Sequence, residues 1–127
     1  MILAKGGDVG PKPRLLLVED EFIIRTYVAE ELRDAGFIVV EAANSTEALT
    51  LLNADPGYEL LITDIRLNSP IDGLQLATWV RQTLPAVKVI IASANAELVE
   101  PHRYDAVFAK PYDISRLLGK IRLLIAD

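Results

Sequence analysis

The stretch YELLITDIR, residues 58–66, decides the fold class of this chain. Its apolar centre, residues 60–62, is typical of a central parallel strand that helices cover on both faces. In open parallel α/β sheets, ligands bind at the carboxyl ends of the strands, and Asp64 falls there. Because Asp also often begins a turn after a strand, Asp64 alone leaves a plain structural role open. The other strand ends therefore decide which role applies.

The composition limits the class of protein. A chain of 127 residues forms one domain with one core, and no apolar run approaches the roughly 20 residues of a membrane span. The first residues lack the layout of a secretory signal, so we expect a cytoplasmic protein without a membrane partner. The absence of cysteine excludes disulfides and thiolate metal sites. A net charge of −5 disfavours direct DNA binding, because that binding needs clustered Lys and Arg.

Apolar runs and amphipathic segments alternate along the chain. Strands are expected at residues 15–18, 37–40, 60–64, 87–92 and 106–109. Helices are expected at about residues 22–35, 44–53, 72–84 and from 113 onward, with a short helical piece between 94 and 103. This alternation predicts an α/β fold of the flavodoxin-like, doubly wound type, (βα)5, with five parallel strands in the order 2-1-3-4-5. Residues 1–13, rich in Gly and Pro, are expected to form a flexible tail before a single domain at 14–127.

Local signals mark several helix ends. Asn44 and Glu47 can form a capping box at the start of the second helix, and Asp72 with Gln75 can form another at the start of the third. Gly36 stands where a left-handed residue commonly ends a helix.

Polar side chains follow four of the expected strands: Glu19 and Asp20, Asp64, Ser93, and Lys110. In the predicted order the first and third strands are neighbours, so the three carboxylates should crowd together and repel one another unless a cation relieves them. Oxygen ligands without His or Cys favour Mg²⁺. A carboxylate beside Mg²⁺, a lysine and a hydroxyl is equipped to accept a phosphoryl group.

Four short motifs occur in order at these strand ends. They are VEDE at 18–21, TDIR at 63–66 with Asp72-Gly73 following, IASA at 91–94, and AKPY at 109–112. With them the chain resembles the receiver domain of two-component response regulators over about residues 14–126. It is most similar to stand-alone receivers and to those attached to hybrid kinases, in which the fourth helix is shortened.

The resemblance implies a function and the residues that carry it. A histidine kinase or histidine phosphotransfer protein would donate a phosphoryl group from phosphohistidine to Asp64, and altered binding to a downstream protein would pass on the signal. Such a domain is not an enzyme beyond its own Mg²⁺-dependent phosphorylation and dephosphorylation. The implied site residues are, for Mg²⁺, Glu19, Asp20, Asp64 and the backbone carbonyl of Arg66, and for the phosphoryl oxygens, Ser93 and Lys110, with a cis bond before Pro111.

The chain departs from the family pattern in three places. The loop from Asp64 to Gly73 is one residue longer than usual, and the segment from Ser93 to Lys110 is several residues shorter, so we expect a short or irregular fourth helix. Val107 stands where an aromatic switch residue is common, and Tyr104 or Phe108 would have to replace it. These features fall on the face that receivers commonly use for output. A homodimer or a kinase contact there would use the last helix, with Arg116, Lys120 and Arg122 outward.

Two alternative functions remain open. One is a pseudo-receiver, an interaction module that is not phosphorylated. The other is a phosphohydrolase of the haloacid dehalogenase type, which usually needs a second Asp two residues after the nucleophile, where this chain has Arg66. His102, the one histidine, lies in a polar stretch and is interpreted as an exposed bystander.

Overall fold

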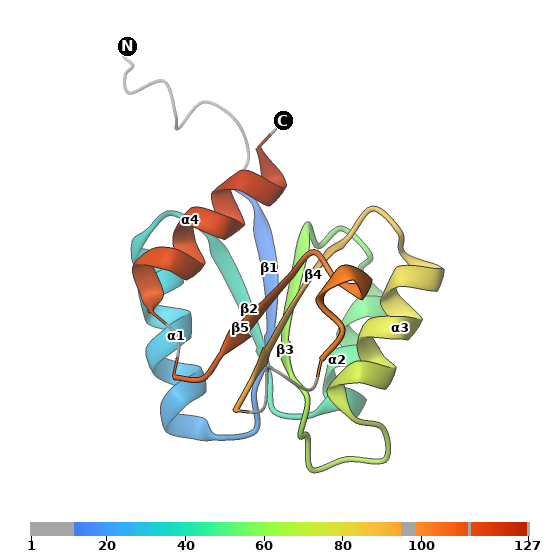
Figure 1. Cartoon of the computed structure of the whole chain (residues 1–127). Helices are drawn as coiled ribbons and strands as arrows, with labels where there is room; N and C mark the ends of the chain where they lie inside the picture. Colours follow the sequence, from blue (N-terminus) through green and yellow to red (C-terminus); the bar gives the residue numbers. More distant parts are fainter. Residues whose placement is uncertain (1–11, 95–98, 112, 127) are drawn as a thin grey trace.

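Five parallel strands form one sheet in the order β2-β1-β3-β4-β5, as predicted. The computed structural model describes residues 12–94, 99–111 and 113–126, and Figure 1 shows their arrangement. The strands are β1 (Arg14–Val18), β2 (Ile38–Ala42), β3 (Leu60–Asp64), β4 (Lys88–Ser93) and β5 (Ala106–Ala109). The predicted tail falls mostly on residues 1–11, which lie outside the described residues.

Helices cover the sheet on both faces (Figure 1). They are α1 (Phe22–Asp34), α2 (Ser45–Ala54), α3 (Gly73–Thr83) and α4 (Ile114–Ile125). The α1 and α4 helices pack on one face, and the α2 and α3 helices pack on the other. None of the described helices is long and apolar enough to span a membrane.

The buried strands supply both apolar layers by simple alternation. In β1, Leu16 and Val18 pack with α2 and α3, whereas Leu15 and Leu17 pack with α1 and α4. All four side chains are at most 1% exposed. A strand buried on both faces needs an unbroken apolar run, and this is why residues 15–18 and 60–62 read as continuous rather than alternating.

The predicted capping box at the start of α3 is confirmed, whereas the one predicted at the start of α2 is confirmed only in part. Asp72 accepts a hydrogen bond from the Gln75 N–H (2.8 Å), and the Gln75 side chain accepts one from the Asp72 N–H (2.9 Å), which completes a capping box. Asn44 accepts from the Glu47 N–H at 2.9 Å, but the Glu47 carboxylate accepts from the Ala43 N–H instead of the Asn44 N–H. The capping box predicted for α2 is therefore only half correct.

Only part of the segment between β4 and β5 belongs to the described residues. Its described residues form a single 3-10 turn, η3 (Pro101–Arg103), and residues 95–98 of the predicted helical piece lie outside the described part of the chain. His102 is exposed on this turn, as predicted, and its interpretation as a bystander stays a prediction. Val99 is buried at 7% exposure and anchors the segment to the α2–α3 side of the sheet.

Candidate functional site

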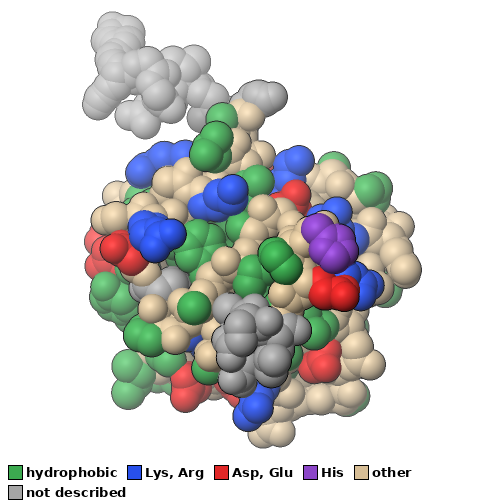
Figure 2. All heavy atoms as spheres, in the orientation of Figure 1, with side chains coloured by type: hydrophobic (Ala, Val, Ile, Leu, Met, Phe, Trp, Pro, Cys, Tyr) green, Lys and Arg blue, Asp and Glu red, His purple; other side chains and the backbone are tan. Residues whose placement is uncertain are grey.

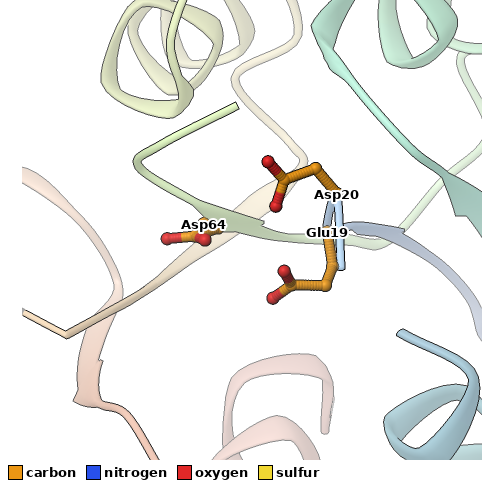
Figure 3. A group of neighbouring side chains, drawn as sticks. All are labelled: Glu19, Asp20 and Asp64. Carbon is orange, nitrogen blue, oxygen red and sulfur yellow. The ribbon is translucent and has the colours of Figure 1, made fainter. Parts of the chain in front are cut away.

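Three carboxylates meet at the carboxyl ends of β1 and β3. The two strands pair in parallel with Val18 opposite Thr63, so the residues that follow, Glu19 and Asp64, emerge side by side. One oxygen from each of Glu19, Asp20 and Asp64 lies within 4.8 Å of the other two (Figure 3). The strand order thus brings together the three acids that the sequence analysis singled out.

The three carboxylates differ in their surroundings. Glu19 is buried at 3% exposure, Asp64 is half-buried and Asp20 is exposed. Burial raises the pKa of Glu19 because desolvation penalises the charged form, and the nearby Asp64 charge acts in the same direction. The Lys110 ammonium and the Glu21 N–H, which donates to Glu19 Oε2 at 3.1 Å, oppose that rise.

Lys110 supplies the positive charge of the cluster. Its Nζ donates to Glu19 Oε1 at 2.6 Å and to Asp64 Oδ2 at 3.2 Å, and its side chain is only 12% exposed. Burial lowers the pKa of Lys110, but its two carboxylate partners outweigh burial and leave the pKa raised above 10.5. Lys110 is therefore protonated at neutral pH. The bond from Lys110 to Pro111 is cis, as the resemblance implied.

Ser93 ends β4, which pairs with β3 on the side opposite β1. Strand pairing sets Asp64 opposite Ala92, and the Lys110 N–H donates to the Ser93 carbonyl oxygen at 2.9 Å. Ser93 is buried at 5% exposure, and it lines the same cavity as Asp64 and Lys110.

These side chains open onto one cavity of about 710 Å³. Its polar end contains Asp20, Asp64, Arg66, Ser93 and Lys110, so five of the six predicted site residues line the same space. Its other end is apolar and lies between α1 and the start of α4. The apolar lining residues are Ile23, Ile24, Tyr27, Val28, Pro111 and Ile114.

The loop after β3 is held against Asp64 by Gly73, whose part in the site the sequence analysis did not recognise. A Cβ atom at Gly73 would lie 1.7 Å from the Asp64 carbonyl oxygen, and the Gly73 N–H donates to the Ile65 carbonyl at 2.7 Å. The sequence feature that could have indicated this role is the Asp72-Gly73 pair: Asp72 caps α3, and Gly73 allows the close approach to the Asp64 carbonyl.

A second contact that the sequence analysis missed fastens the same loop to α2. The Ser45 hydroxyl, on a residue that is 1% exposed, lies 2.6 Å from the Ser69 hydroxyl, and both lie near the Ile71 carbonyl oxygen at 2.9 and 3.1 Å. The Ser69 oxygen also accepts from the Ser45 N–H at 3.1 Å. Either hydroxyl can donate to the other while its partner donates to Ile71, so both hydroxyl protons are used in either arrangement.

The donor set fits a hard divalent cation. Three carboxylates converge and the local ligands are oxygens, which is the chemistry that Mg²⁺ prefers. Glu19 already binds Lys110 and the Glu21 N–H through its two oxygens, whereas the exposed Asp20 carboxylate lines the cavity. Asp20 and Asp64 are therefore the carboxylates best placed to contact an ion directly, with Glu19 behind them.

The two aromatic residues proposed as replacements for Val107 lie on opposite sides of the sheet. Val107 and Tyr104 are half-buried and pack with the α2–α3 layer, whereas Phe108 packs with the α1–α4 layer. Tyr104 thus shares a layer with Val107, and Phe108 does not.

Known proteins share this sequence pattern and fold. A family model for the response regulator receiver domain matches residues 15–122. The receiver protein CpdR of Brucella abortus is 30% identical over 119 residues, which cover 89% of this chain and 98% of CpdR. An NtrX-like response regulator of Rickettsia felis is 35% identical over 111 residues, and this chain spans only 23% of that longer protein. The response regulator TrrA of Thermotoga maritima, solved in complex with Mg²⁺ and BeF, matches with a TM-score of 0.80 and 29% identity, over 89% of this chain and 99% of TrrA.

Proposed function

This chain belongs to the family of response regulator receiver domains of two-component systems, and we propose that Asp64 is its phosphoacceptor. The observation that carries the proposal is the contact of Lys110 Nζ with both Asp64 and Glu19, at 3.2 and 2.6 Å, beside an open cavity. A nucleophilic carboxylate, a fixed ammonium and a convergent acid pair make up the equipment that phosphoryl transfer to an aspartate needs.

The proposed step is an in-line displacement. An oxygen of Asp64 forms a bond to phosphorus while the bond from phosphorus to the donor's imidazole nitrogen breaks, and that nitrogen keeps the electron pair. Lys110 moves from Asp64 to a phosphoryl oxygen, and the Ser93 hydroxyl donates to another. Bound Mg²⁺ would offset negative charge on the phosphoryl oxygens. Asp20, Asp64 and the Arg66 carbonyl would contact the ion, and Glu19 would support the site from behind them.

We infer that the phosphodonor is a histidine kinase or a histidine phosphotransfer protein. Apolar side chains at the start of α1 support this, because Phe22, Ile23 and Tyr27 are 67%, 80% and 55% exposed next to the cavity that contains Asp64. Large exposed apolar side chains at the mouth of a polar site indicate a surface that a protein partner covers.

The signal is proposed to leave through altered binding on the face formed by β5 and α4. A groove along these elements is lined in part by Val107, Phe108 and Leu123, together with Arg116 and Lys120. Figure 2 shows Lys and Arg side chains gathered over α4. A homodimer through this face and a cytoplasmic location both stay predictions.

Intact-mass measurement after incubation with acetyl phosphate and Mg²⁺ tests the proposal. We expect a single phosphoryl adduct, lost in Asp64→Asn and kept in Asp34→Asn, a matched change at an exposed residue that ends α1. Excess chelator should abolish the adduct, because the acidic cluster then repels an anionic donor, and added Mg²⁺ should restore it. A folded wild-type chain that takes no adduct would instead indicate a pseudo-receiver, and an adduct that survives Asp64→Asn would move the acceptor elsewhere.

A further inference from the structure

Arg25 of α1 connects the edge of the sheet to the acidic turn, which comprises residues 19–21. Its Nη1 donates to the Glu19 carbonyl oxygen at 2.8 Å, and its Nε donates to Glu41 Oε1, on the edge strand β2, at 3.2 Å. The Arg25 side chain is only 15% exposed, and its guanidinium lies 5.5 Å from the centre of the Phe22 ring. The guanidinium is thus fixed from three sides.

The carbonyl that Arg25 binds belongs to the peptide unit between Glu19 and Asp20. Because a peptide unit is planar, holding its oxygen also sets the direction in which Asp20 leaves it. The Glu19 N–H donates to the Ala42 carbonyl at 3.0 Å, so the peptide on the other side of Glu19 is fixed as well. Asp20 itself is exposed, and its carboxylate receives no hydrogen bond within the described part of the chain.

We propose that Arg25 is a positioning residue for the divalent cation site: it fixes the Glu19–Asp20 peptide so that the Asp20 carboxylate stays beside Asp64. The proposal rests on the proposed function, in which Asp20 and Asp64 hold Mg²⁺. Groups that orient metal ligands commonly change metal affinity by one to two orders of magnitude when they are removed.

Arg33 provides a matched comparison on the same helix. It also pairs with Glu41, at 3.1 Å, and also donates to a backbone carbonyl, that of Val39 at 2.7 Å. Both partners of its side chain lie on β2, and neither belongs to the acidic turn. Replacement of either arginine by Gln removes one positive charge and one contact to Glu41, but only the change at Arg25 releases the Glu19 carbonyl.

The sign of the effect separates positioning from simple electrostatics. Arg25 is a cation next to a site for another cation, so loss of its charge alone should strengthen Mg²⁺ binding. Loss of positioning should weaken it. A weaker site in Arg25→Gln therefore cannot come from the change in charge.

The experiment is calorimetric titration of the full chain with Mg²⁺, without any phosphodonor. We expect Arg25→Gln to weaken Mg²⁺ binding about tenfold, Arg33→Gln to leave the affinity within a factor of about two, and Arg25→Lys to recover part of the loss, because lysine can still donate to the Glu19 carbonyl. Affinity in Arg25→Gln equal to or tighter than wild type would overturn the proposal. A wild-type chain that binds no Mg²⁺ would instead refute the proposed function.

Amide hydrogen exchange on the metal-free protein gives a second reading. The Glu21 N–H, bonded to Glu19 Oε2, should exchange faster in Arg25→Gln than in Arg33→Gln, and the core strands should remain protected in both. Equal exchange at Glu21 in the two variants would contradict the positioning role. If Arg25→Gln fails to fold, Arg25→Lys carries the same comparison.

Discussion

Gly73 shows how one missing side chain shapes the site. A Cβ there would lie 1.7 Å from the Asp64 carbonyl oxygen, a distance that requires the backbone of Asp64 to move. We expect Gly73→Ala to lower the free energy of unfolding by about 1–3 kcal/mol, as overpacking of a close contact does. Gly119→Ala, inside α4, is the control, because its added Cβ meets no described atom within 4 Å apart from its chain neighbours and the backbone of its own helix. That control should gain up to about 1 kcal/mol from helix propensity.

Urea unfolding of both variants measures the difference. Equal stability of the two alanine variants would show that the loop moves aside at no cost. With acetyl phosphate, the displaced Asp64 should also be phosphorylated more slowly in Gly73→Ala than in Gly119→Ala.

At the same scale, the sequence predicted which residues gather but not how they touch. The polar site residues could be predicted because each follows an apolar run and the carboxyl ends of parallel strands meet at one edge of the sheet. They are Glu19, Asp20, Asp64, Ser93 and Lys110. The 2.6 Å pair of Lys110 with Glu19, closer than that with Asp64, depends on side-chain geometry that no spacing encodes. The roles of these residues stay predictions until phosphorylation is measured.

At the scale of elements, the loop from β3 to α3 depends on a contact between two serines that are distant in sequence. Ser69→Ala removes the bonds of its hydroxyl to Ser45 and Ile71 and leaves the buried Ser45 with fewer partners. We expect a loss of about 1–2 kcal/mol in the free energy of unfolding. Ser115→Ala, at an exposed position in the first turn of α4, is the matched control and should change stability little.

Urea unfolding compares the two serine variants. Hydrogen exchange at the Ser45 amide, which donates to Ser69, localises the effect to the start of α2. Unchanged protection of that amide in Ser69→Ala would mean that the loop is held by other contacts.

Elements were more predictable than the contacts between them. Strand runs, the Asp72 cap and the left-handed Gly36 follow from local rules, and all three are found. The Ser45–Ser69 and Arg25–Glu41 contacts join residues 24 and 16 positions apart, so they arise only once the sheet has formed. The Glu47 carboxylate accepts from the N–H of Ala43 rather than from that of Asn44, and local capping rules do not resolve this shift of one residue.

At the scale of the whole molecule, Lys110 follows β5 and pairs with carboxylates at the ends of β1 and β3. Because one of these carboxylates is buried, the free energy of unfolding should depend on pH. Lys110→Met would leave Glu19 buried and unpaired, which costs up to about 3 kcal/mol at neutral pH without divalent cations. The pKa of Glu19 is already raised by burial and rises further without the lysine. As the pH falls through that raised pKa, Glu19 is protonated, so the deficit should shrink in acid.

Unfolding free energies at neutral and mildly acidic pH test this dependence. In the wild type Lys110 stays charged across this pH range because the pKa of its ammonium is raised. The pH dependence therefore comes from Glu19, and the contribution of the pair falls as the pH drops through the raised pKa of that carboxyl. Glu19→Gln in the Lys110→Met background should recover most of the lost stability, and Lys120→Met on α4 serves as the lysine control. A deficit in Lys110→Met that stays constant with pH would show that the buried Glu19 charge is not its cause.

The same ion pair spans 91 positions of the chain, from the end of β1 to the end of β5. A polypeptide still emerging from the ribosome exposes Asp64 well before Lys110 has been synthesised. Such a nascent chain has the Asp64 carboxylate without the ammonium that neutralises it, and without the β5 strand that supports Ser93. The acidic cluster and the ammonium that neutralises it are therefore complete only once β5 has been synthesised and has paired with β4.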